Sequence, residues 1–228
     1  MMDTDSLLAT LQALFGGVNA WRLCEGLFMS FFISFVSIFF SIIFGSICGL
    51  CMLSRFFVLR VLAKLYLEFV RIVPILALLY VFYFGLPQLL DMNLSNIFVG
   101  IVVFSIWGSA EIGDLVRGAF SSIDKHQRES ALSLGLSPLK VQFFIILPQA
   151  TKRLLPTSIN LFTRIIKTTS LLLFIGVADV LLVARQIIEA NQRFDLAPFI
   201  MYGLLLVLYF VLCYPLSFLS KKLESKWS

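Results

Sequence analysis

Long apolar stretches without charge alternate with short charged stretches along most of the chain. Residues 26–54, 72–90, 92–110 and 196–220 contain no Asp, Glu, Lys or Arg. A helix that crosses the hydrocarbon core of a bilayer needs about 20 mainly apolar residues, so runs of this kind are typical of membrane spans. Strands of a membrane barrel would instead alternate apolar and polar residues over short segments. The pattern therefore predicts an all-α membrane protein.

Five spans fit the pattern, and they place residues 1–228 in a single transmembrane domain. The composition agrees, because 60% of the residues are hydrophobic and 24 are phenylalanine, whereas a soluble domain is about 45–50% apolar. A short helix over residues 6–15 is expected to lie at the membrane surface in contact with lipid. The predicted spans are residues 27–53, 58–85, 94–117, 153–183 and 197–219.

The basic residues predict which ends of the spans face the cytoplasm. Lys and Arg are enriched in cytoplasmic loops, and only Arg22, Arg185 and Arg193 lie on the side opposite to the longest charged loop. We therefore expect the N-terminus outside and the C-terminus inside. The net charge of +5 follows this topology, so no nucleic-acid partner is expected. The residues placed in the cytoplasm are Arg55, Arg60, Lys125, Arg128, Lys140, Lys152, Lys221, Lys222 and Lys226.

The loop over residues 118–152, between the third and fourth spans, is patterned like folded helix. Gly135 predicts the end of a first short helix, because glycine readily adopts positive φ. Ser137 and Pro138 then suit the N-cap and the first residue of a second helix. Two short helices at an abrupt angle would form a shaped surface for docking a partner, although an ordinary interfacial loop helix fits the pattern equally well.

Ionisable and polar side chains recur inside the predicted spans, where they are costly and often functional. One interpretation is a lattice of ion pairs that fixes helix packing. The other is a polar cavity between the second, third and fourth spans that receives a charged or zwitterionic solute. Pro74 is expected to kink the second span near the middle of the membrane. The candidate residues of the solute path are Arg71, Glu111, Asp114, Arg164, Lys167, Thr168, Ser170 and Asp179.

Sequence motifs for catalysis, nucleotide binding and metal binding are absent. No glycine is followed by lysine, so a P-loop is missing, and neither H-E-x-x-H nor G-x-S-x-G occurs. Cys48 and Cys51 lie in an apolar run and are expected to pack rather than react, and His126 lies in a charged loop. We therefore predict no catalytic residue, no metal site and no cofactor in this chain. A transporter of this kind would need a partner to supply ATP hydrolysis.

The loop and the spans together resemble the permease subunits of bacterial ATP-binding-cassette importers for polar amino acids, the histidine/glutamine/arginine/opine group. The signature of that family is Glu-Ala-Ala, three residues, Gly, nine residues, Ile, one residue and Leu-Pro. This chain departs from it only at the middle alanine, which is serine. The matching positions are Glu129, Ser130, Ala131, Gly135, Ile145, Leu147 and Pro148.

The spans carry the resemblance along almost the whole chain. The segment from Asp114 to Gly118 stands where the family has an acidic residue followed by x-x-Arg-Gly, and Glu111 replaces a residue that is more often aromatic. Ile72 and Val73 replace the usual Gly-Thr before Pro74. Lys167, Thr169, Ser170, Leu171 and Asp179 match the segment K-D-T-S-L…I-G-V-x-[DE]-L, in which Thr168 takes the place of Asp or Asn.

The resemblance implies the fold and the partners of a type I importer permease in the bacterial inner membrane. Two cytoplasmic ATPase subunits, which hold ATP and Mg²⁺, would each receive a coupling helix from the loop. A second permease copy, identical or homologous, and an extracytoplasmic amino-acid-binding protein would complete the importer. Transport would proceed by alternating access, and this chain would not itself be an enzyme.

The identity of the solute is the least specific of these predictions. Glu111 and Asp114 favour a cationic amino acid such as arginine or histidine. Arg71, Arg164 and Lys167 would receive a carboxylate equally well, so glutamine or glutamate is the alternative. The alternative to an importer subunit is a self-sufficient channel or secondary transporter, with ion coupling through Glu111, Asp114 or Asp179. A membrane enzyme is disfavoured because no catalytic constellation stands out.

Overall fold

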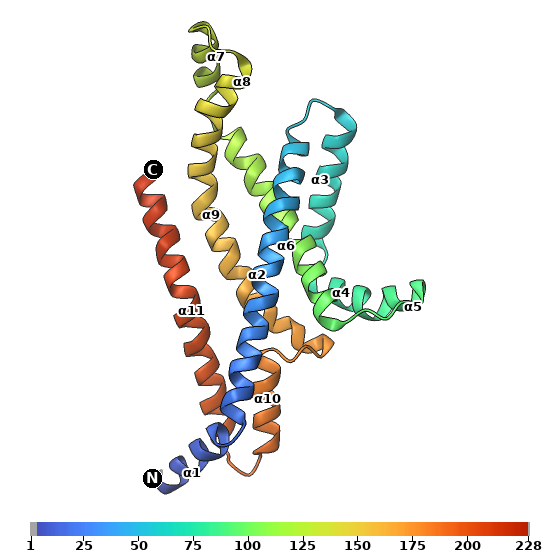
Figure 1. Cartoon of the computed structure of the whole chain (residues 1–228), viewed down its shortest axis with the longest axis vertical. Helices are drawn as coiled ribbons and strands as arrows, with labels where there is room; N and C mark the ends of the chain where they lie inside the picture. Colours follow the sequence, from blue (N-terminus) through green and yellow to red (C-terminus); the bar gives the residue numbers. More distant parts are fainter. Residues whose placement is uncertain (1–3, 228) are drawn as a thin grey trace.

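The structure is a computed structural model that describes residues 4–227, and these residues form helices joined by short turns (Figure 1). The helices are α1 (Thr4–Phe15), α2 (Asn19–Met52), α3 (Phe57–Ile72), α4 (Ile75–Tyr80), the π-helical η1 (Val81–Gly85), α5 (Leu86–Leu90), α6 (Asn96–Ser121), α7 (Lys125–Ser133), α8 (Pro138–Val141), the π-helical η2 (Gln142–Ile146), α9 (Leu147–Thr168), the 3₁₀-helical η3 (Thr169–Ile175), α10 (Val180–Ala190) and α11 (Ala197–Trp227).

Four continuous helical stretches are long and apolar enough to cross a membrane: α2, α6, Pro138–Ile175 and α11. The bent pair Phe57–Ile72 and Ile75–Leu90 brings the number of candidate spans in the described part of the chain to five. Large apolar side chains remain exposed along these helices, for example Phe35 and Phe210, as expected where lipid replaces water around the protein. The predicted all-α membrane fold with about five spans is confirmed.

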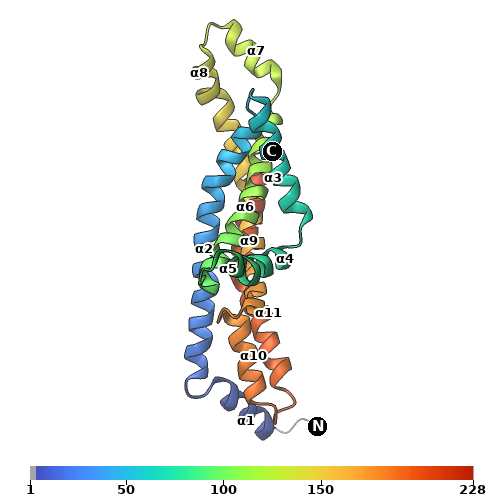
Figure 2. The same cartoon turned by 90° about the vertical axis from the view of Figure 1, so that its right-hand side faces the viewer.

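The second predicted span, residues 58–85, is not one kinked helix. Helix α3 ends at Ile72, and the following helix leaves at 99° to it. The change of direction occurs at Val73 and Pro74, whose ψ angles of 128° and 130° are extended. Proline disfavours a helical conformation in the residue before it and cannot donate a backbone hydrogen bond. As a result α3 runs along the bundle, whereas α4 and α5 extend sideways from its middle (Figures 1 and 2).

The fourth predicted span, residues 153–183, differs at both ends. Its helix begins at Pro138, within the loop predicted between the third and fourth spans, and ends at Ile175. Gly176 then adopts a left-handed conformation, with φ of 74°. Asp179 caps the separate helix α10 by accepting a hydrogen bond from the Leu182 backbone N–H at 2.9 Å. Residues 180–183 therefore belong to α10.

The contact between α2 and α6 depends on small residues. An added Cβ would lie 2.6 Å from Ile112 Cβ at Gly45, and 2.6 Å from Val116 Cβ at Gly49. Ser37 and Ser41 of α2 are also fully buried. Small side chains let two membrane helices approach closely and gain van der Waals contact. This contact fixes α6, the helix that carries Glu111 and Asp114.

Candidate functional site

Three arginines and two acids form a charged cluster where α3, α6 and α9 meet. Asp114 of α6 lies at its centre and accepts hydrogen bonds from two arginines. Arg71 Nη1 donates to Asp114 Oδ2 at 3.2 Å. Arg117 Nη2 and Nε donate to Asp114 Oδ1 at 2.6 and 3.1 Å. The C-terminal end of α3 is thereby attached to the middle of α6.

A second ion pair follows one helical turn away on α6. Arg164 Nη1 of α9 donates to Glu111 Oε2 at 3.3 Å. The Arg164 guanidinium also lies over the ring of Trp107, 5.3 Å from its centroid, an arrangement that favours a cation electrostatically. The pairs of Arg71 with Asp114 and Arg164 with Glu111 thus connect the three helices that were predicted to enclose a cavity.

The charged cluster lies on an open face of the chain rather than inside it. The Arg71 and Arg164 side chains are 46% and 53% exposed, whereas those of Asp114 and Glu111 are 27% and 19% exposed. Within the described chain the charged cluster is therefore open on one side, and the polar cavity between the three spans stays a prediction. Glu111 and Asp114 share one face of α6, as their spacing indicated. Helices α3 and α9 pack on either side of this face and leave it partly exposed. Charges so exposed are costly in hydrocarbon, so this face is expected to meet protein or water rather than lipid.

Three more predicted residues continue this face along α9 and η3. Lys167 is exposed and forms no ion pair with the residues that the structure describes. The Thr168 hydroxyl donates to the Arg164 carbonyl at 2.8 Å, and the Ser170 hydroxyl donates to the Lys167 carbonyl at 2.9 Å. Both hydroxyl oxygens can still accept a hydrogen bond.

Asp179 is separate from the charged cluster. Its side chain is fully buried, and Oδ1 caps α10. The backbone around Asp179 lies directly against Gly26 of α2, where an added Cβ would be 3.0 Å away. Oδ2 has no hydrogen-bond partner among the described residues. The structure therefore places Asp179 in the packing between α2 and α10, away from the open face.

One member of the charged cluster and one aromatic residue in contact with it were missing from the predicted site. Arg117 is the second partner of Asp114, and Trp107 is the ring beneath Arg164. Both lie on α6, Arg117 three residues after Asp114 and Trp107 four residues before Glu111. This spacing places them on the same helical face as the acids and could have identified them.

At one end of the bundle, α7 and α8 form the predicted pair of short helices (Figures 1 and 2). Gly135 has φ of 82°. The Gly135 and Leu136 N–H groups donate to the carbonyls of Leu132 and Ala131, which is the glycine-dependent Schellman ending of a helix. Ser137 then caps α8 through the Lys140 N–H. The predicted helix–glycine–helix conformation is confirmed.

The pair of short helices is fixed to α6 and α9 by its own small core. Ala131 and Val141 are buried together with Ala119 and Ile146, and Ile145 packs against them. Polar contacts reinforce this core. Gln149 Nε2 donates to Gln127 Oε1 at 2.6 Å, and Arg153 Nη1 donates to the Ser122 carbonyl at 2.6 Å.

Large apolar side chains are exposed on and just after this helix pair, among charged and polar ones. Leu134, Leu139 and Phe144 are 83%, 71% and 77% exposed. Among the predicted docking residues, only Ala131 is buried and Ile145 is partly covered. The others, Glu129, Ser130, Gly135, Leu147 and Pro148, are exposed. We call residues 125–148 the coupling segment.

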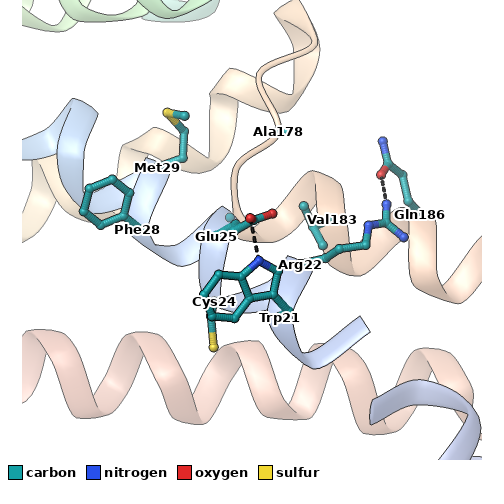
Figure 3. Close-up of a pocket in the computed structure, with 10 residues that line it drawn as sticks. Trp21, Arg22, Cys24, Glu25, Phe28, Met29, Ala178, Val183 and Gln186 are labelled. Atoms are coloured by element: carbon teal, nitrogen blue, oxygen red, sulfur yellow. Dashed lines mark hydrogen bonds between the residues drawn. The ribbon is translucent and has the colours of Figure 1, made fainter. Parts of the chain in front are cut away.

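A cleft of about 700 Å³ lies at the opposite end of the molecule, between the beginning of α2 and α10 (Figure 3). Trp21 Nε1 donates to Glu25 Oε1 at 2.6 Å on its rim. Arg22 Nη2 donates to Gln186 Oε1, also at 2.6 Å, and connects the two helices. Phe28 and Met29 supply apolar walls. Sequence patterns did not reveal this cleft, because its walls come from segments about 160 residues apart.

The part of the chain that the structure describes contains no group of three or more His, Cys, Asp or Glu side chains arranged to hold a metal ion. Cys48 and Cys51 are free thiols.

Residues 41–227 match the sequence profile of the family described as "Binding-protein-dependent transport system inner membrane component". The chain is 32% identical over 182 residues to the arginine transport system permease protein ArtQ of Bacillus subtilis, covering 80% of this chain and 81% of the relative. It is 32% identical over 202 residues to the probable glutamine ABC transporter permease protein GlnP of the same organism, covering 89% and 92%.

Two solved structures have a similar fold. The crystal structure of an amino acid ABC transporter with histidines superposes with a TM-score of 0.82 at 26% identity and covers 99% of both chains. The inward-facing MetNI methionine ABC transporter superposes with a TM-score of 0.73 over 92% of this chain and 97% of that one. Its identity of 18% supports the fold alone.

Proposed function

The chain belongs to the family of binding-protein-dependent transport system inner membrane components, and we propose that it is the permease subunit of an importer for polar amino acids. The observation that carries the proposal is the coupling segment, which is fixed to α6 and α9 and exposes the apolar side chains of Leu134, Leu139 and Phe144. A partner ATPase that binds this surface can move both helices, because the segment shares a buried core with them and is not a flexible loop between them. Alternating access would follow from tilting α6 and α9.

The open charged face supports a second permease copy as a partner. Arg71, Arg164 and Lys167 project from the bundle within the predicted spans, where lipid would leave them poorly solvated. An identical or homologous chain laid against this face would turn two open faces into one polar path. The proposed solute path therefore runs between subunits, with Glu111 and Asp114 on its wall.

The finer proposal is a cationic amino acid, such as arginine or histidine, with Glu111 and Asp114 as contacts for its side chain. The similarity to a permease named for arginine supports it. Glutamine or glutamate is the second candidate, because both acids are already paired with arginines. The face also carries more cations than acids, because Lys167 adds to the three arginines. This excess of positive charge favours first contact with a carboxylate of the solute.

The proposed assembly places the chain in a bacterial inner membrane with its N-terminus outside and its C-terminus in the cytoplasm. The coupling segment then meets two ATPase subunits, which would hold ATP and Mg²⁺. The cleft lined by Trp21 and Arg22 then faces the extracytoplasmic binding protein. This orientation is supported by the predominance of basic residues near the coupling segment and the C-terminus.

The test is uptake into proteoliposomes that contain the chain with its ATPase and binding protein. Labelled arginine, histidine, glutamine and glutamate are compared with ATP, without ATP and without the ATPase. We expect uptake of one of these amino acids only when ATP, the ATPase and the binding protein are all present. Flux through the chain alone would overturn the proposal and favour the channel or secondary transporter.

A further inference from the structure

A pocket of about 510 Å³ lies beneath the coupling segment, where α2 and α6 end and α7 begins. Its floor is apolar and comes from Leu50 and Leu53 at the end of α2, Phe120 of α6 and Ile146 of η2. Lys125 and Arg128 of α7 form its rim. We call these six residues the basic pocket. An apolar floor beneath a cationic rim is suited to an anionic amphiphile.

The two basic side chains lie on the side of α7 that faces the bundle. Lys125, Arg128 and Ala131 are spaced three residues apart and therefore share one helical face. Ala131 is 3% exposed and packs into the core beneath the coupling segment. The apolar docking surface around Leu134 and Leu139 is exposed elsewhere on the segment. A ligand in the basic pocket would thus leave the docking surface free.

The cationic rim is available to a ligand. Neither Lys125 nor Arg128 forms an ion pair with the residues that the structure describes. Asp124 is the acid in the lining, and its Oδ1 caps α7 by accepting the His126 N–H at 3.0 Å. The lining therefore carries a net positive charge, and the cap orients its only carboxylate toward the helix backbone.

An exposed apolar track leads from the basic pocket along α2. Leu50, Ile43 and Phe39 follow one another at spacings of seven and four residues, so they share one side of the helix. Their side chains are 53%, 40% and 55% exposed. The track extends from the pocket toward the middle of the predicted span, which is the path that a lipid acyl chain would take from a headgroup at the membrane surface.

We propose that the basic pocket binds an anionic phospholipid, with the phosphate on Lys125 and Arg128 and an acyl chain along Leu50 and Ile43. Basic pockets between membrane helices attract anionic headgroups by adding charge attraction to apolar burial. The bound lipid attaches the start of α7 to the end of α2. Because α7 leads directly into the docking surface around Leu134 and Leu139, the lipid would hold the coupling segment against the bundle.

The test is lipid retention by the full chain, purified in detergent with the partners that accompany it. Phosphatidylglycerol and phosphatidylethanolamine are titrated separately and counted by native mass spectrometry. The variant Lys125→Gln/Arg128→Gln is compared with Lys221→Gln/Lys222→Gln, which removes two exposed basic residues of α11. We expect about tenfold weaker retention of phosphatidylglycerol in the first variant, no change in the control and no effect on phosphatidylethanolamine.

Two further arms identify the ligand chemistry. Leu53→Gln alters the floor but keeps both charges, and it should also weaken retention of phosphatidylglycerol. Inorganic phosphate at millimolar concentration should not displace the lipid, and displacement would indicate a site for free anions. Equal retention by both double variants would overturn the proposal. Loss of ATPase association with unchanged lipid retention would also overturn it, because the pocket would then be a protein-docking surface.

Discussion

Arg164 of α9 and Glu111 of α6 form an ion pair of 3.3 Å, and the same guanidinium lies over Trp107. Helices α6 and α9 are also the two helices on which the coupling segment is packed. One ion pair on the wall of the proposed solute path therefore connects the two helices that an ATPase would move. A solute carboxylate that competes for Arg164, or an ammonium that competes for Glu111, would act directly on this connection.

The first prediction concerns Glu111. In Glu111→Gln, Arg164 loses its anionic partner, and the proposed path loses one of its two acids. We expect uptake by the reconstituted importer to fall at least about tenfold while the amount of inserted protein is unchanged. The measurement is initial uptake rate, normalised to the permease quantified by immunoblot.

Glu189→Gln is the matched control for Glu111→Gln. Glu189 also pairs with an arginine, Arg185 at 2.9 Å, but both side chains are more than half exposed on α10. An exposed pair of this kind contributes about 0–1 kcal/mol to stability, so uptake should remain near wild type. If the two variants transport equally well, Glu111 does not belong to the solute path.

The second prediction concerns Gly135. Its φ of 82° is unfavourable for a residue with a Cβ, although an added Cβ would meet no atom within 4 Å. The left-handed conformation costs an ordinary residue about 1–2 kcal/mol, and a β-branched residue more. Gly135→Val should therefore disorder the turn between α7 and α8 and uncouple ATP hydrolysis from uptake, with insertion retained.

Gly118→Ala is the comparison for Gly135→Val, because Gly118 lies in α6, has no positive φ and also has space for a Cβ. Alanine favours a helix over glycine by about 1 kcal/mol. We expect coupled transport to persist in Gly118→Ala. Normal coupling in Gly135→Val would show that the angle of the turn does not matter for transport.

The local features of the coupling segment could be predicted from sequence because they depend on neighbouring residues. The glycine ending of α7 and the Ser137 cap each involve atoms within about one helical turn. The face shared by Glu111 and Asp114 follows from helical spacing alone. The partners of that face cannot be derived from helical spacing, because they depend on where α3 and α9 pack.

Pro74 shows how far the sequence predicts the shape of a whole span. The sequence around it is apolar enough to cross a membrane, and proline alone predicts only a kink. The observed bend of 99° also depends on the packing of Leu78 and Leu79 of α4 against Val103 of α6 and Leu172 of η3. These partners come from distant segments, so the bend angle cannot be predicted from the sequence of the second span alone.

The third prediction concerns the docking surface of the coupling segment. Leu134 is 83% exposed at the end of α7, and a partner groove would bury it. Replacing a central apolar anchor of an interface commonly costs more than 1 kcal/mol, or about tenfold in affinity. Leu134→Gln should therefore weaken ATPase association by about this factor, as measured by co-purification and titration in detergent.

Val18→Gln is the control for Leu134→Gln. Val18 is 71% exposed just before α2, at the opposite end of the molecule. Its replacement removes a similar apolar surface without touching the coupling segment. ATPase association should remain unchanged. If association is lost equally in both variants, the effect reflects general destabilisation and the assigned docking surface is wrong.

The last prediction concerns the contact between α2 and α6. In Gly49→Leu the new side chain would collide with Val116, because even a Cβ would lie 2.6 Å from Val116 Cβ and 2.8 Å from the Gly113 carbonyl oxygen. Overpacking typically costs about 1–3 kcal/mol, and here backbone lies behind the side chain, so α2 must move away from α6. We expect a lower melting temperature in detergent and loss of transport. Gly203→Leu is the matched control, since Gly203 of α11 has no atom within 4 Å of an added Cβ, and it should melt near wild type. Equal melting of the two variants would show that the close approach of α2 and α6 does not hold α6 in place.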